Sequence, residues 1–486
     1  MTLWGDTPTS AVKPMALVRE LFPAVDPLAA LRRLARLPFS MAFLSQGPSS
    51  DRGRYSYVMA DPVRWIISQG GVCRNSSGQV LRDPWGALRE VTIGGGIAPI
   101  PVLPPFQGGW AGMLGYDLGR WLEDLPQPVV DDFCPPELVV CLYDMVLATD
   151  RLTGRQWIVS SGITNGLNGP SVDSHAARER LAQFSGWLRE APLPLNHSFP
   201  SGVDCHPARL RPLVVRPGVF SHFNRSEYLR VLARGIDYIH AGDCFQVNLA
   251  QRLLHADRPP LGLLENMVLR NPAPFAGWLD WGGGQVISAS PERFLRLQNG
   301  LVSTRPIKGT RPRGNNAEED KALVDELSGS PKDRAENVMI VDLLRNDLGR
   351  SCLPGSIAVP TVCEVESFPT VHHMVSEVLG RVRPGCSPVD LLAGAFPGGS
   401  VTGAPKVRAM EIIAELEETR RGAYCGSFFW IGVNGAMDSN ILIRTITRQG
   451  GWLSFPVGGG IVADSNPESE YLETLYKAEG IFRSLD

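Results

Sequence analysis

The stretch Gly398-Gly-Ser-Val-Thr-Gly-Ala-Pro-Lys406 places three glycines and a lysine within nine residues. It looks like a phosphate-binding loop, but a Walker A loop needs its lysine directly after the second conserved glycine, and Ala404 and Pro405 intervene here. A second glycine-rich segment, Gly458-Gly-Gly460, does not extend to a GxGxxG pattern. Backbone N–H groups in such turns can bind carboxylates. Both segments are therefore candidates for an anion pocket, with tight turns required by the fold as the equal alternative.

The composition around these motifs is that of a globular protein. The 486 residues are 43% hydrophobic and 20% charged, which excludes an intrinsically disordered chain. Lys and Arg total 47 against 50 Asp and Glu, a net charge of -3, so charge gives no reason to expect nucleic acid or an anionic membrane as partner. No apolar run is long enough for a transmembrane helix. Nine cysteines without CxxC spacing argue against a zinc site and favour a reduced, cytoplasmic setting.

Three parts are expected along the chain. Residues 1–160 form an N-terminal region of short strands, residues 161–218 a proline-rich linker or excursion, and residues 219–486 a C-terminal catalytic region. A capping-box pattern, Asn224-Arg-Ser-Glu227, predicts a helix start in the last part. The other expected strands are Arg54–Met59, Trp65–Ser68, Leu138–Thr149, Phe245–Leu254 and Gln285–Leu297, and the other expected helices are His175–Arg189, Lys332–Arg345 and Pro467–Phe482.

Pairs of carboxylates occur on two of these helices. Asp333 and Glu336 lie one turn apart, and so do Glu470 and Glu473, with Lys477 one turn further on. Two helices that each present acids could hold Mg²⁺ through oxygen atoms, with water and an anionic substrate completing the shell. The alternative is a solvated helix face, which spacing alone favours because surface Glu is common.

Two further charged residues lie in segments with catalytic potential. Lys308, in Pro306-Ile-Lys-Gly-Thr310, is flanked by apolar residues and glycine, where a lysine can have a lowered pKa and act as a nucleophile. Glu292, in Ser290-Pro-Glu-Arg-Phe294, could be a buried general acid. An exposed turn lysine and a turn carboxylate are the alternatives, and the sequence alone favours them.

Taken in order, the motifs resemble those of the chorismate-utilising enzymes. The resemblance is strongest over residues 220–486, and two N-terminal segments also fit. The segments that carry it are Gly53–Tyr57, Gly108–Leu118, Gly242–Asn248, Ser290–Arg293, Asp342–Gly349, Gly398–Lys406, Tyr424–Ser427 and Gly458–Asp464. The resemblance implies an α+β fold, in which two antiparallel β-sheets pack as a sandwich with surrounding helices and the active site lies in a nearby cleft.

The residue at position 308 indicates a branch of that family. Anthranilate and salicylate synthases usually carry Ala there, whereas Lys308 is similar to the lysine of aminodeoxychorismate synthases. In that branch the lysine is taken to attack ring C2 of chorismate while the C4 hydroxyl leaves, after which ammonia attacks C4 and expels the lysine. Glu292 then corresponds to the general acid/base. Gln246 stands where isochorismate and salicylate synthases place a water-activating lysine, and Gln cannot act as a base.

The resemblance also implies the other site residues. Glu336 and Glu473 correspond to Mg²⁺ ligands, and the ion would neutralise the ring carboxylate. Arg444 corresponds to the fork for the enolpyruvyl carboxylate, for which bidentate geometry suits Arg. His373 matches an active-site histidine. The remaining residues of the anion pocket are Gly309, Thr310, Tyr424, Gly458, Gly459 and Lys477.

The implied reaction yields 4-amino-4-deoxychorismate, a precursor of 4-aminobenzoate and folate. The chain contains no glutaminase segment, so we expect ammonia from a separate glutaminase subunit or from solution. Phe43-Leu-Ser-Gln46 replaces the Leu-Glu-Ser element with which relatives often bind tryptophan, which argues against tryptophan binding. Two alternatives stay open. One is anthranilate synthase component I, against which Lys308 argues, and the other is an inactive ligand-sensing relative, against which the complete set of charged residues argues.

Overall fold

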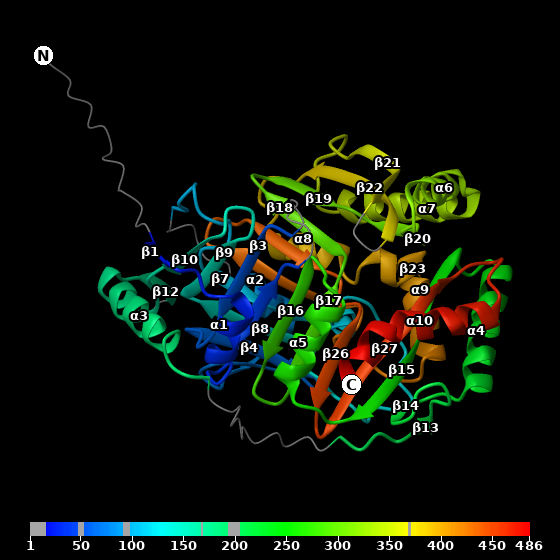
Figure 1. Ribbon diagram of the computed structural model, residues 1–486, viewed down its shortest axis with the longest axis horizontal. Helices are drawn as coiled ribbons and strands as arrows, with labels where there is room; N and C mark the ends of the chain where they lie inside the picture. The colour runs from blue at the N-terminus through cyan, green and yellow to red at the C-terminus, as the bar shows by residue number, and fades with distance from the viewer. Residues whose placement is uncertain (1–15, 47–52, 91–97, 167–168, 193–204, 368–370) are drawn as a thin grey trace, which may run out of the picture.

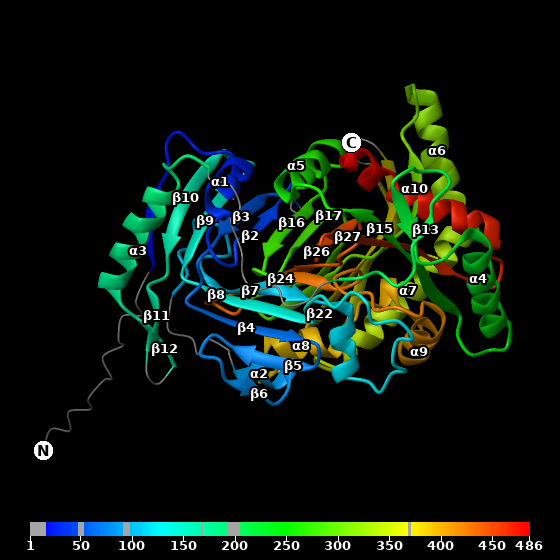
Figure 2. The same cartoon turned by 90° about the horizontal axis from the view of Figure 1, so that it is seen from below.

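The computed structural model describes residues 16–46, 53–90, 98–166, 169–192, 205–367 and 371–486. Two large antiparallel sheets dominate it, and Figure 2 shows them layered one on the other. The family fold expected from the sequence, an α+β sandwich of two antiparallel sheets with surrounding helices, is confirmed. A small hairpin of β11 (Ile163–Gly166) and β12 (Gly169–Val172) lies apart from both sheets.

The first sheet has 13 strands and includes segments from both ends of the chain. Its strands, in spatial order, are β1 (Leu17–Glu20), β10 (Arg155–Ser160), β9 (Met145–Asp150), β3 (Tyr55–Met59), β2 (Met41–Leu44), β16 (Phe275–Asp280), β17 (Gln285–Ser290), β26 (Thr445–Gln449), β27 (Trp452–Ile461), β15 (Gln246–Ala256), β14 (Val219–Ser221) and β13 (Arg211–Pro212), with β23 (Gly403–Ala404) paired to β15.

The second sheet has 12 strands and is assembled in the same mixed way. Its strands, in spatial order, are β20 (Ile307–Pro312), β22 (Val371–Arg381), β19 (Leu301–Thr304), β18 (Arg293–Gln298), β25 (Met437–Asn440), β24 (Ser427–Gly432), β7 (Gly109–Leu114), β8 (Leu138–Tyr143), β4 (Arg64–Gln69), β5 (Val72–Asn75) and β6 (Val80–Leu81), with β21 (Ala358–Ser367) paired to β22.

Helices cover the outside of the sandwich, as Figure 1 shows. The α-helices are α1 (Pro27–Leu34), α2 (Pro84–Glu90), α3 (Ser174–Trp187), α4 (Arg225–His240), α5 (Pro260–Arg270), α6 (Ala317–Gly329), α7 (Pro331–Gly349), α8 (Pro388–Ala395), α9 (Lys406–Leu416) and α10 (Pro467–Leu485), and two short 3₁₀ helices are η1 (Tyr116–Trp121) and η2 (Gly399–Val401). The predicted capping box is confirmed, because Asn224 and Glu227 exchange hydrogen bonds at the start of α4.

The expected single strands Leu138–Thr149 and Gln285–Leu297 are wrong, because each is two strands in different sheets. The chain leaves the second sheet at Asp144 between β8 and β9, where Arg180 of α3 pairs with the buried carboxylate at 2.9 Å. It passes from β17 to β18 through Pro291 and Glu292. Proline has no N–H to donate to a strand ladder, so it favours a break at this point.

The two sheets join the N-terminal and C-terminal parts of the chain. In the first sheet β2 pairs with β16, and in the second β7 pairs with β24. The segment 161–218 contributes α3, whose Arg180 also contacts Asp61 at 2.7 Å. The boundaries near residues 160 and 218 stay a prediction.

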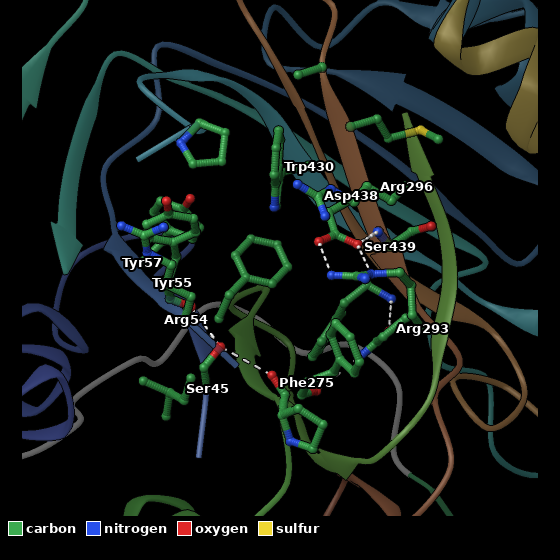
Figure 3. Close-up of a pocket in the computed structure, with 18 of the residues that line it drawn as sticks. Ser45, Arg54, Tyr55, Tyr57, Phe275, Arg293, Arg296, Trp430, Asp438 and Ser439 are labelled. Atoms are coloured by element: carbon green, nitrogen blue, oxygen red, sulfur yellow. Dashed lines mark hydrogen bonds and ion pairs between the residues drawn. The ribbon is translucent and has the colours of Figure 1, made fainter. Parts of the chain in front are cut away.

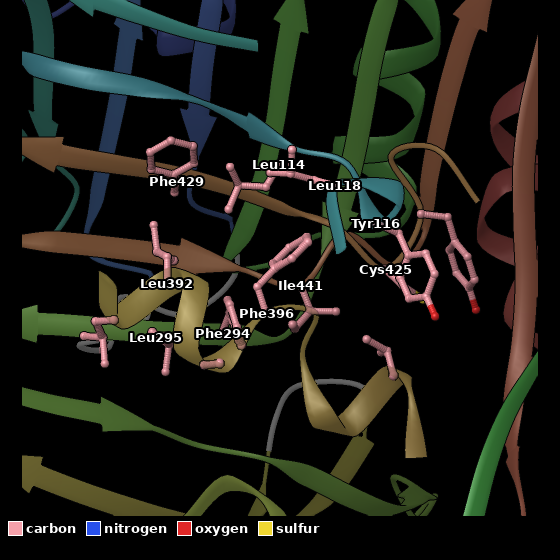
Figure 4. Packing of buried hydrophobic residues seen from close by; sticks show 14 of the residues in the cluster. Leu114, Tyr116, Leu118, Phe294, Leu295, Leu392, Phe396, Cys425, Phe429 and Ile441 are labelled. Carbon is pink, nitrogen blue, oxygen red and sulfur yellow. The ribbon is translucent and has the colours of Figure 1, made fainter. Parts of the chain in front are cut away.

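A large apolar core fills the space between the second sheet and α8. Figure 4 shows Phe294, Leu392, Phe396 and Ile441 directed toward one another. The ring centres of Phe294 and Phe396 lie 6.5 Å apart in an edge-to-face arrangement, which is a favourable geometry for an aromatic pair. Since Glu292 is two residues before Phe294, this packing fixes the backbone next to a predicted catalytic residue.

Candidate active site

Glu292 lies at the point where the chain passes from the first sheet to the second. Its side chain is buried, with 8% of the residue exposed, and the Ser400 hydroxyl donates a hydrogen bond of 2.7 Å to its Oε1 atom. Burial raises the pKa of Glu292, while the Ser400 hydrogen bond and the charge of Lys308 oppose that rise. A carboxyl that holds its proton more firmly than usual suits a general acid.

Lys308 lies on β20, where the pairing with β22 is irregular, and its side chain is partly buried. Burial lowers the pKa of the Lys308 ammonium, and the nearby Lys477 lowers it further. Glu336, Glu292 and Glu473 oppose this effect through their negative charge. The structure therefore brings the predicted nucleophile, the predicted acid and both predicted Mg²⁺ ligands into one electrostatic neighbourhood.

The glycine run at the end of β27 lets charged side chains approach the sheet. A Cβ atom on Gly460 would lie 3.2 Å from Lys308 Nζ and 3.0 Å from Gln246 Nε2. A Cβ on Gly459 would lie 3.2 Å from Glu470 Oε2 and 3.6 Å from Lys477 Nζ. Larger residues would fill the space between these charged groups.

Gln246 is a buried amide in this neighbourhood. No part of it is exposed, and neither Nε2 nor Oε1 has a hydrogen-bond partner among the described residues. Buried polar atoms are rarely left unpaired, so the amide of Gln246 next to Lys308 has hydrogen-bonding capacity available to a ligand.

The two carboxylates predicted to bind Mg²⁺ directly, Glu336 and Glu473, both act on the charge of Lys308. Glu336 lies on α7, and no hydrogen bond or ion pair engages its side chain within the part of the chain that the structure describes. Glu473 lies on α10, with 51% of its side chain exposed, and pairs with Lys477 at 2.6 Å. No compact group of three or more His, Cys, Asp and Glu side chains occurs among the described residues. Since Mg²⁺ is often held by one or two carboxylates, waters and an anionic substrate, this pair fits the ion.

The two carboxylates predicted to lie near the ion are already engaged by protein groups. Asp333 accepts a hydrogen bond from Arg311 at 3.1 Å, and its side chain lies next to Gly309. Glu470 accepts one from the Ser465 hydroxyl at 2.7 Å. Both are thus held in place by the protein itself.

Gly309, Thr310 and His373 form the edge of the site. Gly309 has a φ of +77°, and a Cβ there would lie 2.9 Å from Leu327 and 3.0 Å from Asp333 Cγ, so only glycine fits. The Thr310 hydroxyl and His373 Nδ1 share a hydrogen bond of 2.9 Å that joins β20 to β22.

Arg444 lies at another passage between the sheets, from β25 to β26. Its backbone has a φ of 52°, which a bulky residue seldom adopts and which is often found at functional sites. Burial lowers the pKa of its guanidinium. Its Nη1 atom donates to Asn271 Oδ1 at 3.3 Å, and no carboxylate pairs with it among the described residues. A cation withdrawn from water without a counterion is well suited to an anionic ligand.

Tyr424, Gly458 and Lys477 are held by neighbouring protein groups. Tyr424 is buried, and burial raises the pKa of its hydroxyl well above the ordinary value. The Arg421 guanidinium lies 5.6 Å from its ring centre. Lys477 donates to the carbonyl of Gly458 at 3.0 Å, so that this lysine is tied to the glycine run.

Comparisons with known proteins show the family of this chain. Residues 46–483 match the protein family described as chorismate binding enzyme. The chain belongs to that family. It is 40% identical to the aminodeoxychorismate synthase component 1 of Salmonella typhimurium over 461 residues, covering 93% of this chain and 94% of the relative.

Two anthranilate synthases are also similar to this chorismate binding enzyme. Identity to the component 1 of Thermus thermophilus is 38%, over 95% of both chains. The crystal structure of anthranilate synthase component I from Streptococcus pneumoniae superposes with a TM-score of 0.75 at 32% identity, covering 89% of this chain and 93% of that one. The relatives thus include both branches weighed in the sequence analysis.

Two residues of the chorismate binding enzyme were not found from its sequence. Ser400 donates a hydrogen bond to Glu292 and lies inside the 398–406 motif. Its hydroxyl, next to two glycines, was a signal from which a site residue could have been predicted. Arg421 donates to the carbonyls of Val401 and Asn248 at 2.9 and 2.7 Å and thereby joins separate motifs. Nothing in the sequence around Arg421 indicates these partners.

A pocket is lined by residues from both the N-terminal and the C-terminal parts of the chain. Figure 3 shows Arg54, Arg293, Trp430 and Asp438 around it. Arg293 makes a two-pronged ion pair with Asp438 at 3.0 and 3.1 Å. None of the predicted catalytic residues lines this pocket, although Arg293 directly follows Glu292.

Among the described residues, no helix is both long and apolar enough to span a membrane.

Proposed function

We propose that this chorismate binding enzyme acts as an aminodeoxychorismate synthase component 1, converting chorismate and ammonia to 4-amino-4-deoxychorismate for 4-aminobenzoate and folate synthesis. The observation that carries the proposal is Lys308, a partly buried lysine whose pKa is lowered and which lies in the same electrostatic neighbourhood as Glu292. The similarity to the Salmonella typhimurium enzyme over almost the whole chain supports it.

In the first step the neutral amine of Lys308 forms a bond to ring C2 of chorismate. The two ring double bonds shift from C1=C2 and C5=C6 to C1=C6 and C4=C5, and the C4–O bond breaks. Glu292 gives its proton to the departing hydroxyl, which leaves as water. Lys308 is then bound to C2 as a secondary ammonium. Burial favours both starting states, because it lowers the pKa of the Lys308 ammonium and raises that of the Glu292 carboxyl.

In the second step ammonia forms a bond to C4, the two double bonds shift back, and the C2–N bond to Lys308 breaks, so that the secondary ammonium leaves as the neutral amine of Lys308. The ammonium formed at C4 gives one proton to Glu292, which the first step left as a carboxylate. Glu292 is thereby protonated again. Atoms balance over the cycle, since the substrate exchanges a hydroxyl group for an amino group and Lys308 is regenerated.

Arg444 and two carboxylates orient the dianionic substrate. Arg444 is proposed to bind the enolpyruvyl carboxylate with two parallel hydrogen bonds, while Asn271 holds its Nη1 side. Glu336 and Glu473 are proposed to hold Mg²⁺, which when bound supplies positive charge for the ring carboxylate. Thr310 and His373 border the site, joined by their hydrogen bond.

Ammonia is proposed to come from a separate glutaminase subunit. The similar proteins carry the name component 1, which is consistent with a second component. We also propose a cytoplasmic setting, because all nine cysteines are free thiols, as a reducing compartment would keep them.

Product identification tests the proposed function. The purified chain is incubated with chorismate, Mg²⁺ and ammonium, and the products are separated and identified by mass. The expected product is 4-amino-4-deoxychorismate. Anthranilate instead would show the other branch of the family, and no turnover with ammonium or with a glutaminase would show an inactive relative; either result overturns the proposal.

A further inference from the structure

Asn248 lies on the face of the first sheet that carries Gln246. It stands directly opposite Gly460 in the pairing of β15 with β27, and directly opposite residues project from the same face. It is also two residues after Gln246 on β15, which again means the same face. Since a Cβ on Gly460 would lie 3.2 Å from Lys308 Nζ, Asn248 projects from the face that Lys308 approaches.

The side-chain amide of Asn248 has an unused hydrogen-bond donor. The residue is 6% exposed, and its Nδ2 atom is buried without a partner among the described residues. Asn440 offers a contrast on another strand, because its Oδ1 accepts from the Phe428 N–H at 2.8 Å and its Nδ2 donates to the Phe275 carbonyl at 3.0 Å. Buried asparagine amides are normally satisfied as in Asn440.

The backbone of Asn248 is held on both sides, so the unused donor is fixed in place. Its N–H donates to the carbonyl of Thr402 at 2.8 Å, and its own carbonyl accepts from Arg421 at 2.7 Å. Both partners belong to segments that border the site. A side chain anchored in this way presents its amide with little freedom to turn elsewhere, which favours ligand binding.

We propose that Asn248 is a substrate-binding residue whose Nδ2 donates a hydrogen bond to an oxygen atom of chorismate. The inference rests on the proposed function. Among the unpartnered atoms of the described residues, Asn248 contributes only a donor. A hydrogen-bond donor requires an acceptor. Chorismate offers carboxylate, hydroxyl and ether oxygens as acceptors, whereas ammonia has three N–H donors and a single lone pair.

The test compares Asn248→Ala and Asn248→Asp with Asn440→Ala as a matched control. Steady-state kinetics with ammonium and saturating Mg²⁺ give KM and kcat for chorismate, and equilibrium dialysis without ammonium gives its Kd. We expect Asn248→Ala to raise both KM and Kd about tenfold, as for loss of a hydrogen bond to a charged acceptor. Asn248→Asp raises them more, because a carboxylate then faces a dianion.

Thermal unfolding separates binding from structure. Asn248→Ala removes no hydrogen bond within the protein, so its midpoint should equal that of the wild type. Asn440→Ala removes two and should lower the midpoint while leaving KM within about twofold. A wild-type KM and Kd in Asn248→Ala, or a lowered midpoint with unchanged affinity, would overturn the inference. If the wild type binds chorismate but makes no 4-amino-4-deoxychorismate, the proposed function fails, and the dialysis still decides the role of Asn248.

Discussion

Two cations of this enzyme, the buried Arg421 and the partly buried Lys308, differ in how completely protein groups bind them. Arg421 contacts Glu417 through two nitrogen atoms at 2.5 and 2.8 Å, donates to two backbone carbonyls, and lies over the ring of Tyr116 at 4.6 Å. Lys308 Nζ makes no hydrogen bond or ion pair within the part of the chain that the structure describes. Charges that hold the fold are saturated, whereas the charge assigned to chemistry keeps its bonding capacity for a ligand.

The pKa values of the two cations are therefore shifted in opposite directions, although burial acts on both in the same way. Desolvation alone would lower both, and it does lower the pKa of Lys308. The pKa of Arg421 is instead raised well above its ordinary value, because Glu417 lies in direct contact. Carboxylates that act on Lys308 only at a distance cannot offset its desolvation, which leaves the amine available as a nucleophile.

The largest effect is expected from Lys308→Ala. Loss of the nucleophile should reduce kcat for 4-amino-4-deoxychorismate by at least about 10⁴-fold, as removal of a nucleophile does in other enzymes. The Kd for chorismate should change little. Because no protein hydrogen bond is lost, the unfolding midpoint should stay equal or rise. Product formation followed by chromatography checks this, and undiminished synthesis would remove Lys308 from the mechanism.

Arg421→Met tests the other side of the comparison. It leaves Glu417 buried without its counterion, which should cost about 3–5 kcal/mol of unfolding free energy. The double variant Glu417→Leu with Arg421→Met removes both charges and should recover much of that loss. Urea denaturation measures the three stabilities. Equal losses in the single and double variants would contradict a saturated, structural ion pair.

The sequence could predict the fold because its motifs occur in a known order, and it could predict helices with clear local signals. The capping box at Asn224 is such a signal. It could not locate the passages between sheets, since an apolar run such as 138–149 reads as one strand whether or not it changes sheets. Asp144, the polar residue that interrupts the run, was the available clue, but its partner Arg180 is 36 residues away.

The candidate site was predictable where residue type and spacing carried the signal, as for Glu292, Lys308 and the carboxylates. Contacts between residues that lie far apart in the sequence were not predictable. Ser400 binds Glu292 across 108 residues, and Arg311 of strand β20 engages Asp333 of helix α7. Helix spacing placed Asp333 beside Glu336 but gave no information on this competing arginine, which only the tertiary fold brings near.

Glu336→Gln sharpens the distinction between open and engaged carboxylates. The amide should weaken Mg²⁺ dependence, raising the Mg²⁺ concentration for half-maximal activity about 10- to 100-fold, because one charged oxygen ligand is lost. Asp333→Asn is the matched control on the same helix, and its effect should be smaller since Arg311 already engages Asp333. Titration of activity with Mg²⁺ measures both. An unchanged titration for Glu336→Gln would reject it as a ligand.

Ser400→Ala removes the hydrogen bond that the Ser400 hydroxyl donates to the Glu292 carboxylate. This bond favours the carboxylate form and opposes the raised pKa of Glu292, so removing it should raise that pKa further. Glu292 must be protonated to release the hydroxyl, so one of the two pKa values that shape the pH profile of kcat/KM belongs to Glu292. That pKa should move upward by about one pH unit, the size expected when a hydrogen bond to a charged group is lost. The other pKa, which belongs to Lys308, should move less. Ser400→Thr keeps the hydroxyl and should retain the wild-type profile, whereas a profile in which neither pKa moves upward in Ser400→Ala would show that Glu292 is not the acid.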